Sequence, residues 1–371
     1  QYHDRFQTDA ETFRSGATAT VELYYTAKAD GDGLAESASS DTPGTDKIIR
    51  RKIYYSEAAF ADPDTGTWVE FTPAPADDAS FATVKAALLE YLKARTGGTV
   101  PISLKQTWEE VDEASLLLDT YTGASAAYSL RKLRTLYTGS AVRVRRASDN
   151  TEQDIGFTAG ELDTTSLASF CGSSDGFVKV WYCQSGNSND AEQTTTGNQP
   201  KIYDGSTGVV TENGKPAVEF DGASTYLRNS NLTTSGAHTI FTVDQYIDED
   251  NENVLYDSDT SPQSIAFVNG SDQWNISYGN NFNTLHNANS SQNLHGFFID
   301  GASSEFYENG VSVATGNVGT NNMSGVTIGA TRAAAVPWRG MIQEFLIYDS
   351  DQSSNRTGIE TNLNTFYSIY S

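Results

Sequence analysis

The sequence predicts a mainly β protein in which a small N-terminal α+β domain is followed by a jelly-roll β-sandwich. Beyond residue 137, short apolar segments alternate with Gly, Asn, Asp and Ser turns about every ten residues, a spacing typical of β-sandwiches. Aromatic residues make up 11% of the chain and charged residues only 19%, which favours strands over helices. The 371 residues are enough for two domains with separate cores.

Residues 1–115 are expected to form the α+β domain. Alternating apolar and polar residues predict strands at 17–27, 47–60, 67–73 and 100–108. Before the last of these, residues 77–96 place apolar side chains at helical spacing and end at Gly97 and Gly98, which predicts a helix. A polar segment, 31–46, is predicted to be a long loop.

Residues 116–371 are expected to form the sandwich, and the change in composition at 109–125 marks the boundary between the domains. The segment 125–137 is predicted to form a short helix, after which strand-length segments follow one another. The closing segment, 353–370, has Ile359, Leu363 and Phe366 at helical spacing and predicts a helix that packs on the sandwich.

Composition and charge exclude several classes of function. The net charge of −24 argues against a nucleic-acid partner, because few basic groups are available to neutralise phosphates. No apolar run approaches 18 residues and no signal peptide is recognised, so no membrane span is expected. No cofactor is predicted. The acidic segment 247–253 offers oxygen ligands for calcium but lacks the spacing of a calcium loop, which favours a solvated turn.

The two cysteines, Cys171 and Cys183, are predicted to be free, mostly buried thiols. Cys171 ends a short predicted helix, and Cys183 ends the strand at 177–183. A strand of about seven residues advances roughly 3.3 Å per residue, so Cys183 lies roughly 20 Å from the turn beside Cys171. A disulfide requires the two Cα atoms to lie within about 7 Å of each other.

The C-terminal half resembles the concanavalin A-like, laminin-G-type lectin and glucanase family. The segments that carry this resemblance are GKPAVEFDGASTYL (214–227), FYENGVSVATG (306–316), GVTIGATR (325–332) and WRGMIQEFLIYDSD (338–351). The resemblance implies a concanavalin A-like sandwich for residues 116–371.

A second resemblance involves residues 116–157 and 170–193. These segments are similar to the start of the catalytic domain of α-L-arabinofuranosidase B, glycoside hydrolase family 54, and the same start precedes laminin-G-like sandwiches in phage and viral structural proteins. The full combination most resembles the virion proteins. It implies a virion structural protein, namely a capsid decoration, tail or fibre component, located on the particle surface or tail and assembled in the host cytoplasm.

The virion resemblance also implies partners. Residues 1–115 are expected to dock to other virion proteins, the sandwich is expected to bind host surface glycans, and a homo-oligomer, preferably a trimer, is expected. Two alternatives stay open: a secreted α-L-arabinofuranosidase-like glycoside hydrolase, and a purely architectural decoration protein.

The sequence does not predict catalysis. A retaining glycosidase needs two carboxyl groups about 5–5.5 Å apart. The segment VLYDSDTS (254–261), the nearest match to the strand that we associate with the family's nucleophilic Glu, offers Asp257 and Asp259 but no Glu. Cys183 stands where the similar turn of that family has an Asp. We therefore expect no enzymatic activity and retain Asp257 and Asp259 only as candidates.

Aromatic and amide side chains near two turns are the candidates for carbohydrate binding, since sugars stack on aromatic faces and their hydroxyls bond to amides. These candidates are Tyr182, Gln184, Asn187, Trp274, Tyr278, Asn280 and Asn281. The alternative interpretation is that Trp274 belongs to the core and that residues 184–190 form only a tight connection.

Three arginines alternate on one predicted strand, Arg143, Arg145 and Arg146, and Asp149 and Asp154 follow closely. The simplest interpretation is that these arginines pair with the two aspartates and fix the entry of the chain into the sandwich.

Limited proteolysis should separate the two predicted domains. Cleavage is expected within 109–125 or 31–46, since proteases cut exposed polar connections, and it should leave a resistant fragment of about 250 residues. Mass spectrometry of a time course identifies the fragment. Uniform digestion across 116–371 would contradict the prediction.

Overall fold

The structure is a computed structural model that describes residues 2–4, 6–15, 19–27, 48–56, 67, 69–70, 98–111, 116–247 and 252–370. Up to residue 111 it describes the course of the strands and their pairing. The chain divides into two compact units, Gln1–Ser115 and Leu116–Ser371. Each unit is described by itself below.

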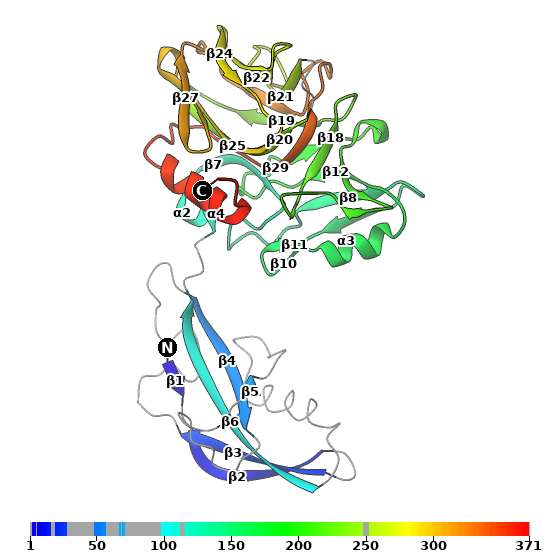
Figure 1. Ribbon diagram of the computed structural model, residues 1–371. Coiled ribbons are helices and arrows are strands. Elements are labelled where there is room, and N and C mark those ends of the chain that lie inside the picture. Colours follow the sequence, from blue (N-terminus) through cyan, green and yellow to red (C-terminus); the bar gives the residue numbers. More distant parts are fainter. Residues whose placement is uncertain are drawn as a thin grey trace. The chain divides into compact units, whose positions relative to one another are not determined.

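The N-terminal unit contains a β-sheet whose strand order is β2-β3-β6-β4-β5, with β1 paired to β6 (Figure 1). The strands are β1 (Tyr2–Asp4), β2 (Phe6–Ser15), β3 (Ala19–Ala27), β4 (Ile48–Ser56), β5 (Val69–Glu70) and β6 (Gly98–Val111). Strands β3 and β6 run parallel, and the other pairs are antiparallel. The four strands expected from the sequence correspond to β3, β4, β5 and β6. The expected helix at 77–96 and the expected loop at 31–46 lie outside the described residues.

The C-terminal unit is built mainly of antiparallel strands. They are β7 (Ala124–Ser129), β8 (Val142–Arg146), β9 (Glu152–Ile155), β10 (Phe157–Thr158), β11 (Glu161–Leu162), β12 (Gly176–Trp181), β13 (Ala191–Glu192), β14 (Lys201–Asp204), β15 (Gly208–Val209), β16 (Thr211–Glu212), β17 (Lys215–Pro216), β18 (Val218–Asp221), β19 (Leu227–Thr233), β20 (His238–Tyr246), β21 (Asn253–Asp257), β22 (Ile265–Val268), β23 (Gln273–Ser277), β24 (Asn281–Asn287), β25 (Gln292–Ile299), β26 (Ser304–Glu308), β27 (Val311–Gly316), β28 (Ser324–Ile328) and β29 (Arg339–Tyr348). The helices are α2 (Leu117–Thr120), α3 (Thr164–Cys171) and α4 (Arg356–Tyr367), with short 3₁₀ turns η1 (Thr196–Asn198) and η2 (Gly301–Ser303). The prediction of a mainly β chain is confirmed.

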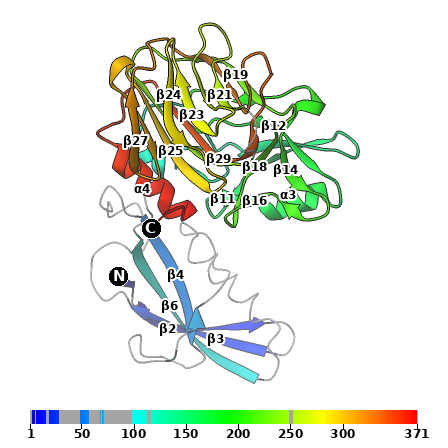
Figure 2. The same ribbon diagram turned by 45° about the horizontal axis from the view of Figure 1, so that its top comes forward.

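The centre of this unit is the run of strands β7-β29-β20-β25, which is buried on both faces. On β20, Ile240 belongs to the larger core, while its neighbour Phe241 belongs to a second core that includes Leu363 and Tyr367 of α4. Successive residues of a strand point to opposite faces, so the strands read as nearly continuous apolar runs. Figures 1 and 2 show α4 lying against these strands.

The larger core fills the space between these central strands and the strands β19, β28, β21, β22, β23 and β24. Aromatic rings dominate it: Trp274 lies 5.9 Å from Phe297 and 6.0 Å from Trp338 between ring centroids. Tyr256 meets Phe297 and Phe345 edge to face, an arrangement that aromatic pairs favour. These contacts fix Tyr256, and with it the end of β21, where Asp257 lies.

The predicted helix at 125–137 is wrong, because residues 124–129 form the strand β7. Ala126 and Tyr128 belong to the larger core, whereas Ala127 belongs to the core under α4. This alternation is the period of a strand between two layers, and small alanines concealed it in the sequence. The predicted helices that include Cys171 and residues 353–370 are confirmed as α3 and α4.

A buried ion pair joins the segment just after β7 to β29 and α4. The guanidinium of Arg131 donates to Glu344 at 2.8 and 3.1 Å and to Asn362 at 2.9 Å. Tyr367 donates its hydroxyl to the same carboxylate at 3.0 Å. Removing one member of such a pair costs about 3–5 kcal/mol, because the other charge is left buried without a partner.

A second buried polar chain crosses from β20 to β26. His295 lies between Asp244, at 2.9 Å from Nδ1, and Glu308, at 3.2 Å from Nε2. Burial alone would lower the pKa of His295, but the charge of Asp244 and hydrogen bonds to Asp244 and Glu308 raise it to about 9. Burial would raise the pKa of Glu308, but hydrogen bonds with His286 and His295 lower it to about 2.

These pKa values predict how the free energy of unfolding depends on pH. The raised pKa of His295 stabilises the fold fully below about pH 6.5, and this contribution is lost as the pH rises toward 9. The lowered pKa of Glu308 stabilises the fold above about pH 4.5, and this is lost as the pH falls toward 2. Urea titrations between pH 5 and 9.5 should therefore show stability falling above pH 6.5.

The variant His295→Gln should lose this dependence between pH 6.5 and 9. His238→Gln is the matched control: burial lowers the pKa of His238, so this histidine titrates below that range and the variant should keep the wild-type slope. An unchanged slope in His295→Gln would refute the assignment.

Candidate functional site

The candidate site lies on a row of side chains that crosses four neighbouring strands. Glu192 of β13 pairs with Arg228 of β19, Arg228 pairs with Thr327 of β28, and Thr327 pairs with Asp257 of β21. Residues directly opposite one another in paired strands share a face of the sheet. The register therefore brings a carboxylate, a guanidinium, a hydroxyl and a second carboxylate into one line.

Asp259, two residues beyond the end of β21, completes the group. Arg228 Nε lies 2.7 Å from Asp259 Oδ1 and donates to Thr327 Oγ1 at 3.2 Å. Ser230 donates its hydroxyl to Asp259 Oδ2 at 2.6 Å, and the Arg228 guanidinium lies over the ring of Tyr226. Asp259 is thus held as an ion-paired carboxylate whose side chain is 9% exposed.

Asp257 is in a different environment, although it is only two residues away. Its side chain is fully buried, and its Oδ2 accepts a hydrogen bond from the backbone N–H of Arg332 at 2.9 Å. Burial raises the pKa of Asp257, against the opposing effect of backbone hydrogen bonds from Arg332 and Ser264. A carboxyl group with a raised pKa can hold a proton and deliver it, as a general acid must.

The segment between β28 and β29 lies over this group. The carbonyl of Arg332 accepts from Arg228 Nη2 at 2.8 Å, so Arg332 bonds to both Arg228 and Asp257. A tight turn follows, in which Thr331 and Ala335 exchange hydrogen bonds. Ala334 adopts a φ of 54° and Val336 a φ of 50°, left-handed values that are strained for these residues and that occur most often at functional or over-determined sites.

The turn after β12 is hydrogen-bonded to strand β7. Ser185 Oγ and the side-chain amides of Asn187 and Asn189 all donate to the carbonyl of Ser125. Cys183 Sγ accepts from the backbone N–H of Ala127 at 3.3 Å, and the Cys183 N–H donates to Asp190. The turn therefore supplies hydrogen bonds that fix two strands, which agrees with the tight-connection interpretation.

Three of the predicted carbohydrate-binding residues lie in the interior. Gln184 is fully buried and bonds to the backbone of Ser129, Arg131 and Leu133. Trp274 belongs to the aromatic core, and Tyr278 shares a hydrogen bond with the hydroxyl of Tyr256. These three side chains cannot contact a ligand from solvent in this conformation, which corrects the list drawn from the sequence.

The other predicted binding residues lie nearer the surface, and the structure does not bring them together with the Asp257 group. Tyr182 donates to Asp154, Asn187 bonds to the carbonyls of Ala124 and Ser125, and Asn280 donates to Asn317. Asn281 is exposed at the start of β24. Their role in binding stays a prediction.

The predicted Arg–Asp pairing is confirmed for two of the three arginines. Arg143 forms a two-pronged pair with Asp154, and Arg146 pairs with Asp149. Arg145 instead bonds to Gln199, Asn150 and the carbonyl of Thr196.

Sequence reasoning missed Arg228 and Thr327. Neither residue belongs to a motif that indicates a site, and only the pairing of β19 with β28 places them beside Asp257 and Asp259.

Within the described residues no group of three or more His, Cys, Asp or Glu side chains is arranged to hold a metal ion. Residues 248–251 of the acidic segment considered for calcium lie outside the described part. The helices that the structure describes are all too short or too polar to cross a membrane.

Comparison with known proteins connects this fold with arabinofuranosidases. Residues 117–256 match the family model described as the catalytic domain of α-L-arabinofuranosidase B. A solved arabinofuranosidase complexed with arabinofuranosyl-α-1,2-xylobiose is similar in structure, with 18% identity and a TM-score of 0.53. So is a glycoside hydrolase family 54 α-L-arabinofuranosidase soaked with a cyclic sulfate inhibitor, with 19% identity and a TM-score of 0.53.

Both structural matches cover 67% of this chain and 64% of the other chain. The chain therefore spans less than two thirds of the length of those proteins, and at this identity the likeness shows a shared fold. No curated protein sequence matches the chain.

These findings contradict two predictions made from the sequence. The interpretation as a virion structural protein is wrong, because the family model and both structures point to arabinofuranosidases. The prediction that the chain is not an enzyme is contradicted by the same matches, since the family model describes a catalytic domain. The predicted trimer, partners and location depended on the virion interpretation, and nothing tests them.

Both cysteines are free and buried, as predicted, and this makes their reactivity predictable. Burial raises the pKa of Cys171 to about 11, so at pH 8 only about one thiol in a thousand is the reactive thiolate. Iodoacetamide should therefore label Cys171 far more slowly in the native chain than in 6 M guanidinium. Non-reducing mass spectrometry that finds a linked 171–183 peptide would contradict the assignment.

Proposed function

We propose that residues 116–371 form a glycoside hydrolase unit of the α-L-arabinofuranosidase type. The observation that carries the proposal is the match of residues 117–256 to the arabinofuranosidase B catalytic domain. That match ends at Tyr256, directly before the two carboxyl groups of the candidate site, so the similar scaffold leads into the group most suited to acid–base chemistry. We also propose that the strands of this unit form a jelly-roll sandwich of the concanavalin A-like type.

In this proposal the two aspartates have different tasks because their surroundings differ. Asp257, whose pKa is raised by burial, protonates the oxygen of the departing group. Asp259, paired with Arg228, supplies the carboxylate that attacks the anomeric carbon or activates water. Glycosidases commonly use one protonated and one ionised carboxyl group in this way.

Access to Asp257 requires movement of the Arg332 segment. Two hydrogen bonds hold this segment over the site. The Arg332 N–H donates to Asp257, and Arg228 donates to the Arg332 carbonyl. The strained φ angles of Ala334 and Val336 lie in the same segment. We therefore assign this segment the role of a cover that opens for the substrate and excludes water when it closes.

Hydrolysis of 4-nitrophenyl α-L-arabinofuranoside by the full chain tests the proposal. Asp257→Asn and Asp259→Asn should each lower kcat by about 100-fold or more, the usual contribution of a general acid or base. Glu252→Gln is the matched control, because Glu252 is exposed and should leave turnover unchanged. Thermal unfolding of each variant shows whether lost turnover reflects lost folding.

Two results would refute the proposal. One is the absence of turnover by the folded wild-type chain on arabinofuranosides, including the case in which the sugar binds without being cleaved. The other is turnover that persists in both aspartate variants, which would place the chemistry elsewhere.

A further inference from the structure

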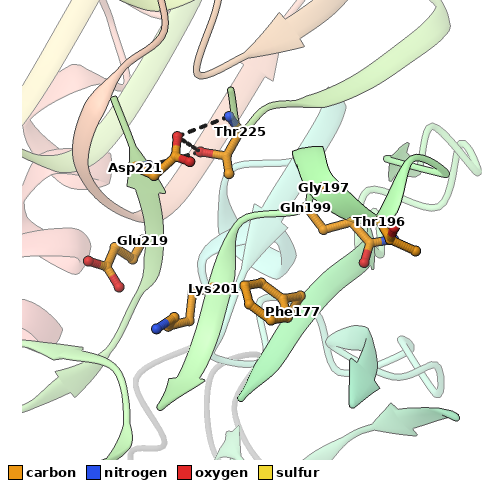
Figure 3. A pocket seen from close by; sticks show the side chains of 8 residues that line it. All are labelled: Phe177, Thr196, Gly197, Gln199, Lys201, Glu219, Asp221 and Thr225. Carbon is orange, nitrogen blue, oxygen red and sulfur yellow. Dashed lines mark hydrogen bonds between the residues drawn. The ribbon is translucent and has the colours of Figure 1, made fainter. Parts of the chain in front are cut away.

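A cavity of about 330 Å³ is lined by residues of strands that do not contribute to the Asp257 group. Three of the lining residues lie opposite one another on paired strands. Phe177 of β12 pairs with Lys201 of β14, and Lys201 pairs with Glu219 of β18. The three side chains therefore share one face of the sheet. Figure 3 shows them side by side, with Asp221 and Thr225 near Glu219 and with Thr196, Gly197 and Gln199 on the side of Phe177.

The walls of this cavity are tied to each other. Asp221 Oδ1 accepts hydrogen bonds from the backbone N–H groups of Ala223, Ser224 and Thr225, which shapes the turn after β18. The Ser224 hydroxyl donates to the carbonyl of Gly197 in η1. The cavity is therefore preformed, as small-molecule sites usually are.

Phe177 supplies an aromatic surface whose orientation is fixed. The guanidinium of Arg145 lies over the ring, 5.0 Å from its centroid, and Arg145 is itself held by Gln199 Oε1 at 2.6 Å. Arg145 covers one face of the ring, and the rest of the ring lines the cavity. An ordered, partly exposed aromatic ring in a preformed cavity is suited to stack against a flat apolar ligand face.

The polar groups of the cavity are mainly acceptors. The side-chain carboxylate of Glu219 lines the cavity, and among the residues that the structure describes it has no hydrogen-bond or ion-pair partner. Asp221 Oδ2 receives only a long bond of 3.4 Å from Ser224 and retains accepting capacity. Lys201 is already paired with Asp175 and Asp204, at 3.1 Å from each, so its charge is neutralised.

We propose that this cavity is a second saccharide-binding site that takes one neutral sugar unit of a glycan. The ring of the sugar stacks on Phe177, and its hydroxyls donate to Glu219 and Asp221. The excess of carboxylates disfavours phosphate, sulfate and uronic acid ligands, in keeping with the net charge of −24. The volume lies at the lower end of the range for ligand sites, about 300–1,000 Å³, which fits one sugar ring.

This proposal goes beyond the hydrolase proposal and does not depend on it. The cavity is formed by β12, β14, β18 and η1, whereas the Asp257 group belongs to β13, β19, β28 and β21. A site of this kind holds a glycan on the protein whether or not the protein hydrolyses that glycan.

Saturation-transfer NMR and calorimetry on the full chain test the site. The probes are methyl α-L-arabinofuranoside, methyl β-D-xylopyranoside and methyl β-D-galactopyranoside, with D-glucuronate and D-glucosamine as charged comparisons. At least one neutral glycoside should bind with a Kd in the millimolar range, and glucuronate should not bind. Phe177→Leu, which removes the flat ring but retains apolar volume, and Glu219→Gln should each weaken this binding by about fivefold or more.

Two control variants separate this site from the proposed active site. Glu252→Gln removes an exposed carboxylate elsewhere and should bind like the wild type, and Asp259→Asn should retain the binding even if turnover is lost. Thermal unfolding curves that match the wild type show that Phe177→Leu and Glu219→Gln are folded, and Phe177→Tyr should preserve the affinity.

Any of three results refutes the proposal. No neutral glycoside binds at concentrations up to about 50 mM, well above the millimolar Kd expected. Alternatively, only glucosamine or glucuronate binds, or both cavity variants bind as the wild type does. Loss of turnover alone would leave this site intact, so failure of the hydrolase proposal is distinguishable from failure of this one.

Discussion

Burial of the strands β20, β25 and β29 on both faces is the constraint on which the rest of the C-terminal unit depends. One face packs against the aromatic core and the other against α4, so water is excluded from both sides of these strands. Any polar side chain within this layer must find its partner inside the protein. Arg131 with Glu344, and Asp244 with His295 and Glu308, satisfy this requirement. The same pairs fix the positions of the surrounding strands.

The candidate site lies at the edge of this core, where buried polar side chains must likewise find partners within the protein. Tyr256 is anchored among aromatic rings, which fixes the end of β21. Asp257 is the next residue, so its side chain points to the opposite face of the strand, where the Arg332 segment covers it. Two residues further along the chain, Asp259 lies beside Arg228 of β19 and forms an ion pair with it. A difference of one strand step thus separates a carboxyl group with a raised pKa from one held by a guanidinium, which is the division of labour that acid–base chemistry needs.

The sequence predicts local features of this protein much better than long-range ones. The free thiols followed from the length of one strand, and α4 followed from Ile359 and Leu363 at helical spacing. The strand β7 was mistaken for a helix because alanines on both faces carry no clear period. Trp274 and Tyr278 were candidates for binding, with the core as the alternative for Trp274. Trp274 pairs with Val268 of β22, and both rings belong to the larger core. Arg228 and Thr327 are 99 residues apart, and no pattern near either one reveals that they touch.

The two carboxylate-containing sites in this unit illustrate how the same sheet can present different chemistry. In the Asp257 group, the two aspartates accept from the Arg332 backbone N–H, the Arg228 guanidinium and the Ser230 hydroxyl, and the Arg332 segment covers them. In the cavity beside Phe177, Glu219 faces open space and Lys201 is drawn away by Asp175 and Asp204. A covered, paired group is suited to moving a proton, since its field acts in a medium of low dielectric constant. An open, unpaired acceptor beside an aromatic ring is suited to holding a hydroxylated ligand without changing it.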